Sequence, residues 1–278
     1  MTGEAGFVAN QAGILDKGFR RILDRIELIL RAAGSGFLFA VFGTGSVVLA
    51  HGVLRIVDRG YPQSERELRA QARIQTWFSW YVRLGVWIGI LGIESSGMEG
   101  LNDEPTLIVA NHPTLLDVVF LLSFVPQGDC VVKSEAWENP ALRGILTAAG
   151  YIPNQGGDEF IEACSARIRA GRSVLIFPEG SRSPKKGLGR FNRGAAHVAL
   201  RTGCRILPVS ITCDPPALKK GQRWYAMPKS RLRYSLRGGK PFRAADVAES
   251  DLAPPLAARK VTEYMRTQFE AELGNGIV

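Results

Sequence analysis

A histidine and an aspartate separated by four residues form the first motif in this sequence that could carry chemistry. His112 and Asp117 lie in the segment 111–117, NHPTLLD, which follows an apolar run at 106–110. A carboxylate bonded to one imidazole nitrogen fixes the tautomer, so the other nitrogen can take a proton from a hydroxyl group. A structural histidine that caps a turn is the more frequent meaning of this spacing, so the motif alone is a weak signal.

A second polar motif, FPEGSRS at 177–183, ends another apolar run. Its proline and glycine favour a sharp loop, so we expect Glu179 and Arg182 to be displayed rather than packed. An arginine offers a planar fork of donors that suits a phosphate or a carboxylate, and lysines at 185–186 add charge beside it. A charged surface turn is the common alternative, but two such motifs at two strand ends favour a site.

The elements that would position these motifs begin near residue 100. Short apolar runs alternate there with helical stretches, which predicts an α/β domain with a mixed sheet flanked by helices. Both motifs then fall where a strand ends and a loop begins. We expect strands at 106–110, 130–133, 173–177, 205–211 and 231–236, and helices at 115–124, 140–149, 158–170, 193–201 and 255–273.

The first 99 residues are apolar and basic. Residues 13–31 have the period of an amphipathic helix with a basic face, 36–57 are about long enough to span a bilayer, and 77–93 are rich in Trp and Tyr. We interpret 1–99 as a membrane-associated helical region and 100–278 as the α/β domain. Arginines flank these runs on both sides, which favours a helical hairpin that dips into the membrane over a double span. Core helices of a soluble protein are the alternative.

Composition and charge limit the classes of partner that this chain could bind. The net charge of +9 requires an anionic partner or surface. Aromatic residues interleaved with basic ones are not evident after residue 100, so we do not expect nucleic acid. His51 and His197 lie in apolar or helical stretches and are interpreted as structural. The cysteines lack the spacing of a zinc site, which predicts reduced thiols in a cytosol-facing protein; they are Cys130, Cys164, Cys204 and Cys213.

Together the motifs resemble the lysophosphatidate/glycerophosphate acyltransferase family of membrane enzymes. That family is marked by a His, four residues and an Asp, matched by His112 and Asp117, and by a Phe-Pro-Glu-Gly-(Ser/Thr)-Arg-Ser block, matched in full at 177–183. A later apolar strand with a central proline is matched at 206–210, and the turn at 191–194 is also similar. The resemblance covers residues 85–240.

This resemblance implies an acyltransferase of the 1-acylglycerol-3-phosphate O-acyltransferase kind, with His112 as general base and Asp117 as its orienting partner. It would move a fatty acyl group from acyl-CoA or acyl-ACP to the free hydroxyl of a lysophospholipid such as lysophosphatidate. It implies no metal and no bound cofactor. The expected partners are membrane lipids and the coenzyme A or acyl carrier protein thioester, at the cytoplasmic face of the inner membrane. The acceptor would be bound by Glu179, Gly180, Ser181 and Arg182, with Arg182 at its phosphate.

One stretch departs from the family pattern. Between the two motifs the family often has a glycine-containing stretch that ends in an arginine and helps to hold the acceptor phosphate, but residues 150–156 here contain none. A non-phosphate lysolipid or a specialised lipid product is therefore an alternative acceptor. Lys133, at the end of a predicted strand, is a candidate electrostatic substitute. An acyl-thioesterase and a non-catalytic membrane lipid-binding protein are the alternatives from other classes.

Overall fold

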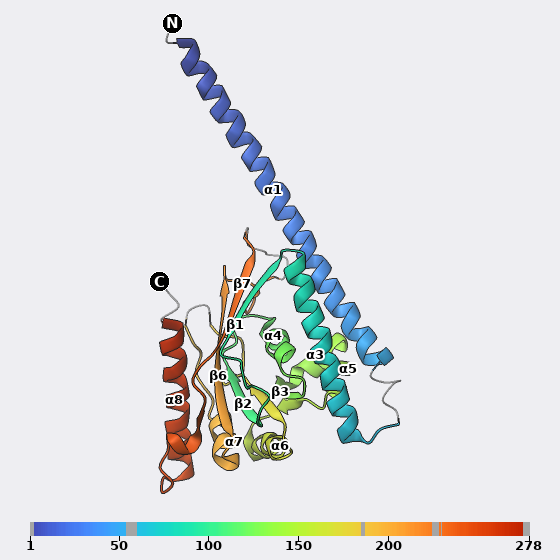
Figure 1. Cartoon of the computed structure of the whole chain (residues 1–278), viewed down its shortest axis with the longest axis vertical. Helices are drawn as coiled ribbons and strands as arrows, with labels where there is room; N and C mark the ends of the chain where they lie inside the picture. Colours follow the sequence, from blue (N-terminus) through green and yellow to red (C-terminus); the bar gives the residue numbers. More distant parts are fainter. Residues whose placement is uncertain (1–2, 54–59, 185–186, 224–227, 229, 275–278) are drawn as a thin grey trace.

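A mixed sheet forms the centre of the computed structural model, which describes residues 3–53, 60–184, 187–223, 228 and 230–274 (Figure 1). Within these residues the strand order is β1-β7-β6-β2-β5-β3-β4, with β8 paired to β6. Most neighbours run parallel, whereas β7 and β8 are antiparallel to β6. The strands are β1 Leu91–Ser96, β2 Thr106–Ala110, β3 Gly128–Lys133, β4 Ile152–Asn154, β5 Ser173–Ile176, β6 Arg205–Asp214, β7 Leu232–Gly238 and β8 Phe242–Arg243.

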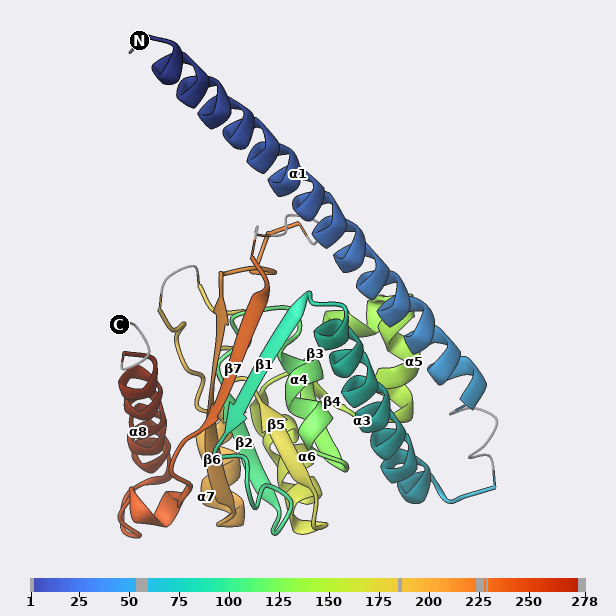
Figure 2. The ribbon, with the colours of Figure 1, turned by 45° about the horizontal axis from the view of Figure 1, so that its top comes forward.

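Helices cover both faces of the sheet. One cluster of buried apolar residues joins it to α1, α3, α4 and α5, and a second joins it to α6, α7 and α8 (Figures 1 and 2). Alternate residues of β2 point to the two clusters, so this strand is buried on both faces, as a central parallel strand must be. The helices are α1 Gly3–Val48, α3 Gln63–Trp87, α4 Asp117–Phe124, α5 Pro140–Ala148, α6 Gly157–Arg169, α7 Gly194–Thr202 and α8 Pro254–Gly274.

The predicted α/β class is confirmed, and the predicted strands and helices are present with ends shifted by a few residues. Three strands were not predicted. Two of them, β4 and β8, have only three and two residues and carry no readable alternation. The third, β1, lies before residue 100, in the run assigned to the membrane region, and supplies an edge of the sheet through its pairing with β7.

The N-terminal region differs from its predicted division. The runs at 13–31 and 36–57 are one continuous helix as far as Val48, followed by a π-helical turn at Leu49–Val53. Residues 54–59 and the basic side chains at 17, 20 and 21 lie outside the described part. The run at 77–93 is the end of α3 and the start of β1, and α3 buries Ile74, Phe78 and Tyr81 against the domain. The same run leaves Trp80 and Trp87 exposed, at 49% and 83%, so its place at a membrane boundary stays a prediction.

α1 carries the long apolar surface. With the turn that follows it, the segment Arg25–Gly52 has 28 residues, enough to cross a bilayer. Its most apolar 18-residue window has a mean hydropathy of 1.7, and only 17% of that window is buried in the protein. Near its C-terminal end it packs on α3, where the Phe42 ring lies 5.3 Å from that of Tyr81. An exposed apolar surface of this kind needs lipid or protein to cover it. It supports the expected membrane association.

The double substitution Ile29→Asp/Leu30→Asp tests the attachment through α1. Both side chains are about two-thirds exposed, at 66% and 65%. Two carboxylates on the apolar surface should lower the fraction of protein bound to anionic phospholipid vesicles about 10-fold or more. Leu256→Asp on α8, where the leucine is 55% exposed, is the matched control and should leave binding unchanged. Full retention of binding by the double variant would contradict attachment through α1.

A buried ionic network ties α3 to the sheet and to α6. The Arg172 guanidinium reaches both Asp129 oxygens at 2.7 and 2.8 Å, and its Nη1 donates to Glu67 at 3.2 Å. Arg167 donates to the same Glu67 oxygen at 2.6 Å, and the Gln71 side chain donates to Asp129 at 3.1 Å. Burial raises the pKa of Asp129 to about 6, although Arg172 and Arg167 act to lower it. The network therefore depends on both cations.

Arg172→Met should lower the free energy of unfolding by about 3 kcal/mol or more, because it leaves the buried Asp129 carboxylate without its cation. Thermal unfolding in detergent micelles measures the effect. The loss should grow from about pH 5 to about pH 8, since Asp129 ionises across that range. Arg169→Met breaks only an ion pair between half-exposed side chains and should cost less than about 1 kcal/mol. Equal losses from the two variants would contradict a structural role for the network.

Candidate active site

The backbone of His112 is held by its neighbours at the carboxyl edge of the sheet. The preceding residue, Asn111, is buried and exchanges hydrogen bonds with the backbone of Ile211 in β6, at 2.7 and 2.9 Å. The His112 N–H donates to the Glu179 carboxylate at 3.2 Å, and its carbonyl accepts from the Ser183 N–H at 2.7 Å. The end of β2 is thereby bound to β6 on one side and to the loop after β5 on the other.

The His112 ring and the Asp117 carboxylate meet at this edge. His112 Nδ1 lies 2.8 Å from Asp117 Oδ2. Asp117 is the first residue of α4, where a negative charge is favoured by the helix dipole, and it also accepts from the Thr114 N–H at 2.7 Å. Burial raises the pKa of the Asp117 carboxyl, and the hydrogen bonds from His112 and Thr114 oppose that rise. Because the carboxylate holds the proton on Nδ1, Nε2 is left as the proton acceptor.

One face of the imidazole is covered by Phe177. The two rings are stacked with their centroids 4.3 Å apart. The His112 side chain still keeps 19% of its surface exposed, whereas Asp117 has none. The arrangement is a buried carboxylate, an oriented imidazole and an accessible edge, which together suit proton abstraction from a hydroxyl or a water.

Glu179 and Arg182 are half-buried and hydrogen-bonded within the protein, so neither is displayed as fully as expected. Glu179 accepts from the His112 N–H, from the Ser183 hydroxyl at 2.5 Å and from the Gly189 N–H at 2.6 Å. Arg182 Nη1 donates to the backbone carbonyls of residues 218 and 219, at 3.1 and 3.2 Å. A tight loop leaves backbone groups without ladder partners, and these side chains satisfy some of them.

The other predicted substrate-binding residues lie around the same loop. Gly180 has φ +64°, and a Cβ there would approach Asn192 Nδ2 to 3.2 Å, so this position requires glycine. The Ser181 hydroxyl has a weak contact at 3.4 Å with the Arg182 carbonyl. Lys133 is exposed at the end of β3, in register with Asn154 of β4. The two lysines at 185–186 lie outside the described part of the chain.

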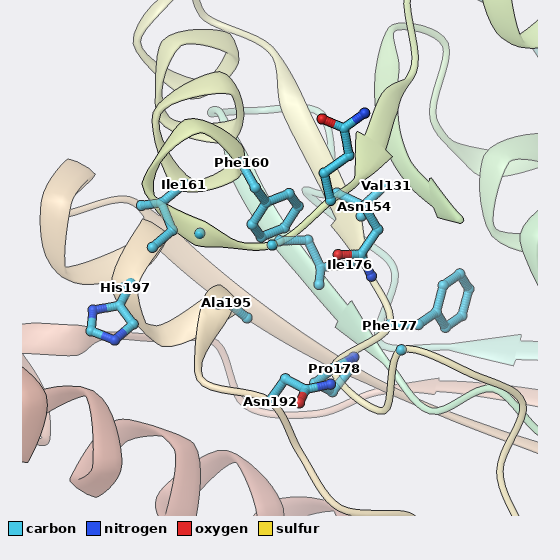
Figure 3. A pocket seen from close by; sticks show the side chains of 15 residues that line it. Val131, Asn154, Phe160, Ile161, Ile176, Phe177, Pro178, Asn192, Ala195 and His197 are labelled. Atoms are coloured by element: carbon cyan, nitrogen blue, oxygen red, sulfur yellow. The ribbon is translucent and has the colours of Figure 1, made fainter. Parts of the chain in front are cut away.

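A cavity of about 480 Å³ opens beside this loop and was not predicted (Figure 3). It lies between the ends of β3, β4 and β5 and the starts of α6 and α7. Its polar side chains include Asn154, Gln155 and Asn192, and Phe160 and Ile176 are among its apolar ones. His197, interpreted as structural from the sequence, also lines it. The unusual composition of 150–156 and the turn at 191–194 were the sequence signals for this region.

Comparison with known proteins agrees with the geometry. Residues 92–212 match the model of the Acyltransferase family. The chloroplastic 1-acyl-sn-glycerol-3-phosphate acyltransferase LPAT1 of Arabidopsis thaliana is 31% identical over 126 residues, which are 43% of this chain and 35% of that protein. The 1-acyl-sn-glycerol-3-phosphate acyltransferase of Pseudomonas aeruginosa is 27% identical over 162 residues, 54% of this chain and 58% of that protein.

The fold is also that of a solved structure. The crystal structure of the 1-acyl-sn-glycerophosphate (LPA) acyltransferase PlsC from Thermotoga maritima superposes with a TM-score of 0.68 at 18% identity, over 91% of this chain and 97% of that one. The sequence matches span less than two thirds of the curated relatives described above. The predicted resemblance is confirmed, because residues 92–212 match the Acyltransferase family model.

Glu179 and Ser181 were both predicted to bind substrate, and the geometry separates them. Glu179→Ala removes three hydrogen bonds, one of them to the His112 backbone, and should lower acyltransferase activity about 100-fold or more by displacing that residue. It should also lower the melting temperature. Ser181→Ala removes one long contact and should stay close to the unmodified protein in both measurements. Full activity of Glu179→Ala would show that its hydrogen bonds do not position His112.

Proposed function

We propose that this chain transfers a fatty acyl group from a coenzyme A or acyl carrier protein thioester to the free hydroxyl of a lysolipid of the lysophosphatidate class. The observation that carries the proposal is the 2.8 Å contact between His112 Nδ1 and the buried Asp117 carboxylate, with 19% of the His112 side chain still exposed. The names of the relatives support the acceptor class. Neither a metal nor a bound cofactor is needed for this chemistry.

The reaction proceeds by direct attack. His112 Nε2 accepts the proton of the acceptor hydroxyl while the hydroxyl oxygen forms a bond to the thioester carbonyl carbon. The tetrahedral intermediate collapses as the carbon–sulfur bond breaks, and the imidazolium returns its proton to the leaving sulfur. The products are an ester and a free thiol. Asp117 stabilises the imidazolium between the two proton transfers, and backbone N–H groups at the strand ends are the candidates for stabilising the oxyanion.

Arg182 already donates from Nη1 to two backbone carbonyls. Its remaining nitrogens and the exposed Lys133 are the cations proposed to attract an acceptor phosphate. The acceptor and donor acyl chains would enter from the side covered by α1 and α3. We place the protein on the cytoplasmic face of the inner membrane, held there by α1, with membrane lipids and the thioester carrier as its partners.

His112→Ala should lower the rate of acyl transfer about 1,000-fold or more, since it removes the base. Asp117→Asn should lose a similar factor while keeping the shape of the site, because the amide cannot stabilise the imidazolium. Labelled acyl-CoA or acyl-ACP with lysophosphatidate in detergent micelles provides the assay. Unchanged melting temperature and vesicle binding serve as controls for folding.

Two results would overturn this scheme. Turnover retained by His112→Ala would exclude the general-base mechanism. Free fatty acid released at the same rate with and without lysolipid would identify a thioesterase, in which water replaces the lipid hydroxyl. If the protein binds vesicles but turns over neither thioester, it is a non-catalytic lipid-binding protein.

A further inference from the structure

The Asp117 carboxylate receives two hydrogen bonds from Thr114 in addition to its contact with His112. The Thr114 N–H donates to Asp117 Oδ2 at 2.7 Å, and the Thr114 hydroxyl donates to Asp117 Oδ1 at 2.5 Å. We propose that Thr114, itself held by the Tyr234 hydroxyl, is a positioning residue that keeps the Asp117 carboxylate charged and aimed at His112. The inference rests on the proposed acyl transfer, in which this carboxylate stabilises the imidazolium.

The direction of the bond between the two side chains follows from their chemistry. An ionised carboxylate only accepts, so Thr114 Oγ1 is the donor in its contact with Asp117. The same oxygen accepts from the Leu116 N–H at 3.3 Å and has capacity for one more donor. Thr114 and Asp117 are both fully buried, so that donor has to come from inside the protein.

Tyr234 of β7 is the donor that the structure offers. Its side chain is fully buried, and among the described residues its hydroxyl has no hydrogen-bond partner. Burial raises the pKa of Tyr234 well above its ordinary value, so the phenol keeps its proton. The side chains of Cys213 and Thr114 are close enough to act on that pKa as well. Donation to Thr114 satisfies a hydroxyl that is otherwise buried at a cost in free energy.

The position of Tyr234 is fixed independently of the catalytic loop. Its ring packs on Phe120, three residues after Asp117 in α4, with the ring centroids 4.4 Å apart. Its main chain lies in β7, paired with Ile93 of β1 on one side and with Cys213 of β6 on the other. A group held by both a sheet and a helix does not have to reorganise when charge develops on the imidazole.

An ordinary helix cap is the structural alternative. Thr114 and Asp117 have the spacing of a capping box, in which the threonine hydroxyl accepts from the backbone N–H three residues later. Here the hydroxyl donates to the Asp117 side chain instead, and within the described chain no side-chain cap bond forms at Leu116, the N-cap of α4. The hydroxyl therefore serves the carboxylate rather than the end of the helix.

Loss of this hydroxyl has a consequence that a lost cap does not have. A neutral donor favours the charged form of a carboxylate, whatever the state of the imidazole. Without the Thr114 hydroxyl, the imidazolium becomes a more important partner of the buried carboxylate, and the catalytic pair holds its proton up to higher pH. The pKa of the pair and the acidic limb of kcat/KM therefore move upward.

The neighbouring titratable groups do not change this direction. Burial raises the pKa of the Cys213 thiol, which stays protonated, as does the phenol of Tyr234. Glu179, which accepts from the His112 main chain, and the exposed Asp214 are the same in every variant compared. The difference between variants therefore reports on the contacts of Asp117.

Thr114→Val tests the proposal at nearly constant side-chain volume. With labelled acyl-CoA or acyl-ACP and lysophosphatidate in detergent micelles, the full-length variant should lose about 10-fold in kcat/KM, and its acidic limb should move up by about 0.5–1 pH unit. Thr114→Ser keeps the hydroxyl and should stay close to the unmodified protein in both values. Tyr234→Phe should move both values in the same direction as Thr114→Val, with a loss of about 3-fold in kcat/KM.

Cys213→Ala is the matched control for Tyr234→Phe. It removes the other polar neighbour of the phenol without touching Thr114, and it should leave the acidic limb in place. An equal shift from Cys213→Ala would assign the Tyr234 hydroxyl to the thiol and overturn its part in holding Thr114.

The His112 ring reports on the same contact without turnover. The chain has three histidines, so isotope labelling of their ring nitrogens gives few NMR signals, and His112→Ala identifies the one from His112. In Thr114→Val this ring should titrate at higher pH than in the unmodified protein, by about as much as the acidic limb moves.

These measurements separate the positioning role from the proposed reaction. If no acceptor is acylated but the ring titration shifts as expected, the positioning of Asp117 stands without the reaction. If Thr114→Val lowers the melting temperature and leaves both the acidic limb and the ring titration unchanged, Thr114 is a helix cap, and the proposal is overturned while the reaction stands.

Discussion

The hydrogen bond from the His112 backbone to Glu179 is the contact on which the catalytic edge depends. It joins the end of β2 to the loop after β5, and the same carboxylate reaches Ser183 and Gly189. This bond fixes the backbone of His112, and the backbone in turn fixes where the imidazole begins. Asp117 then fixes the ring from the opposite direction, through the first turn of α4. Glu179 therefore holds the backbone of His112, and Asp117 holds its ring.

The remaining architecture gives this point two different surroundings. The central strand β2 is paired with β5 and β6, so both neighbours deliver loops to the same edge. Apolar helices cover one face, and the face with α6 and α7 holds the polar cavity. The network of Arg172, Asp129 and Glu67 fixes α3 to the sheet. The two faces of the sheet edge therefore differ in character, one apolar and one polar.

The contact between His112 and Asp117 was predictable because the two residues are close in the sequence. A His and an Asp five positions apart at a strand end and helix start need only one turn to meet. The contacts of Glu179 could not be predicted, because His112, whose main-chain N–H it accepts from, lies 67 residues earlier in the chain. The cavity was missed for a similar reason, because its amides come from separate segments and converge on a glycine with positive φ. The division of α1 into two runs was wrong because glycines at 34 and 36 interrupt the apolar pattern but not the helix.

The length of α1 has a mechanical consequence. At 1.5 Å per residue its 46 residues measure about 69 Å, more than twice the ~30 Å of a hydrocarbon layer. A rod of this length cannot stand upright wholly inside one bilayer, so it must lean or leave part of itself in water. Since its C-terminal portion is packed on the α/β domain, leaning the rod would turn the whole domain with it. Bilayer thickness would then adjust the height of His112 relative to the membrane surface.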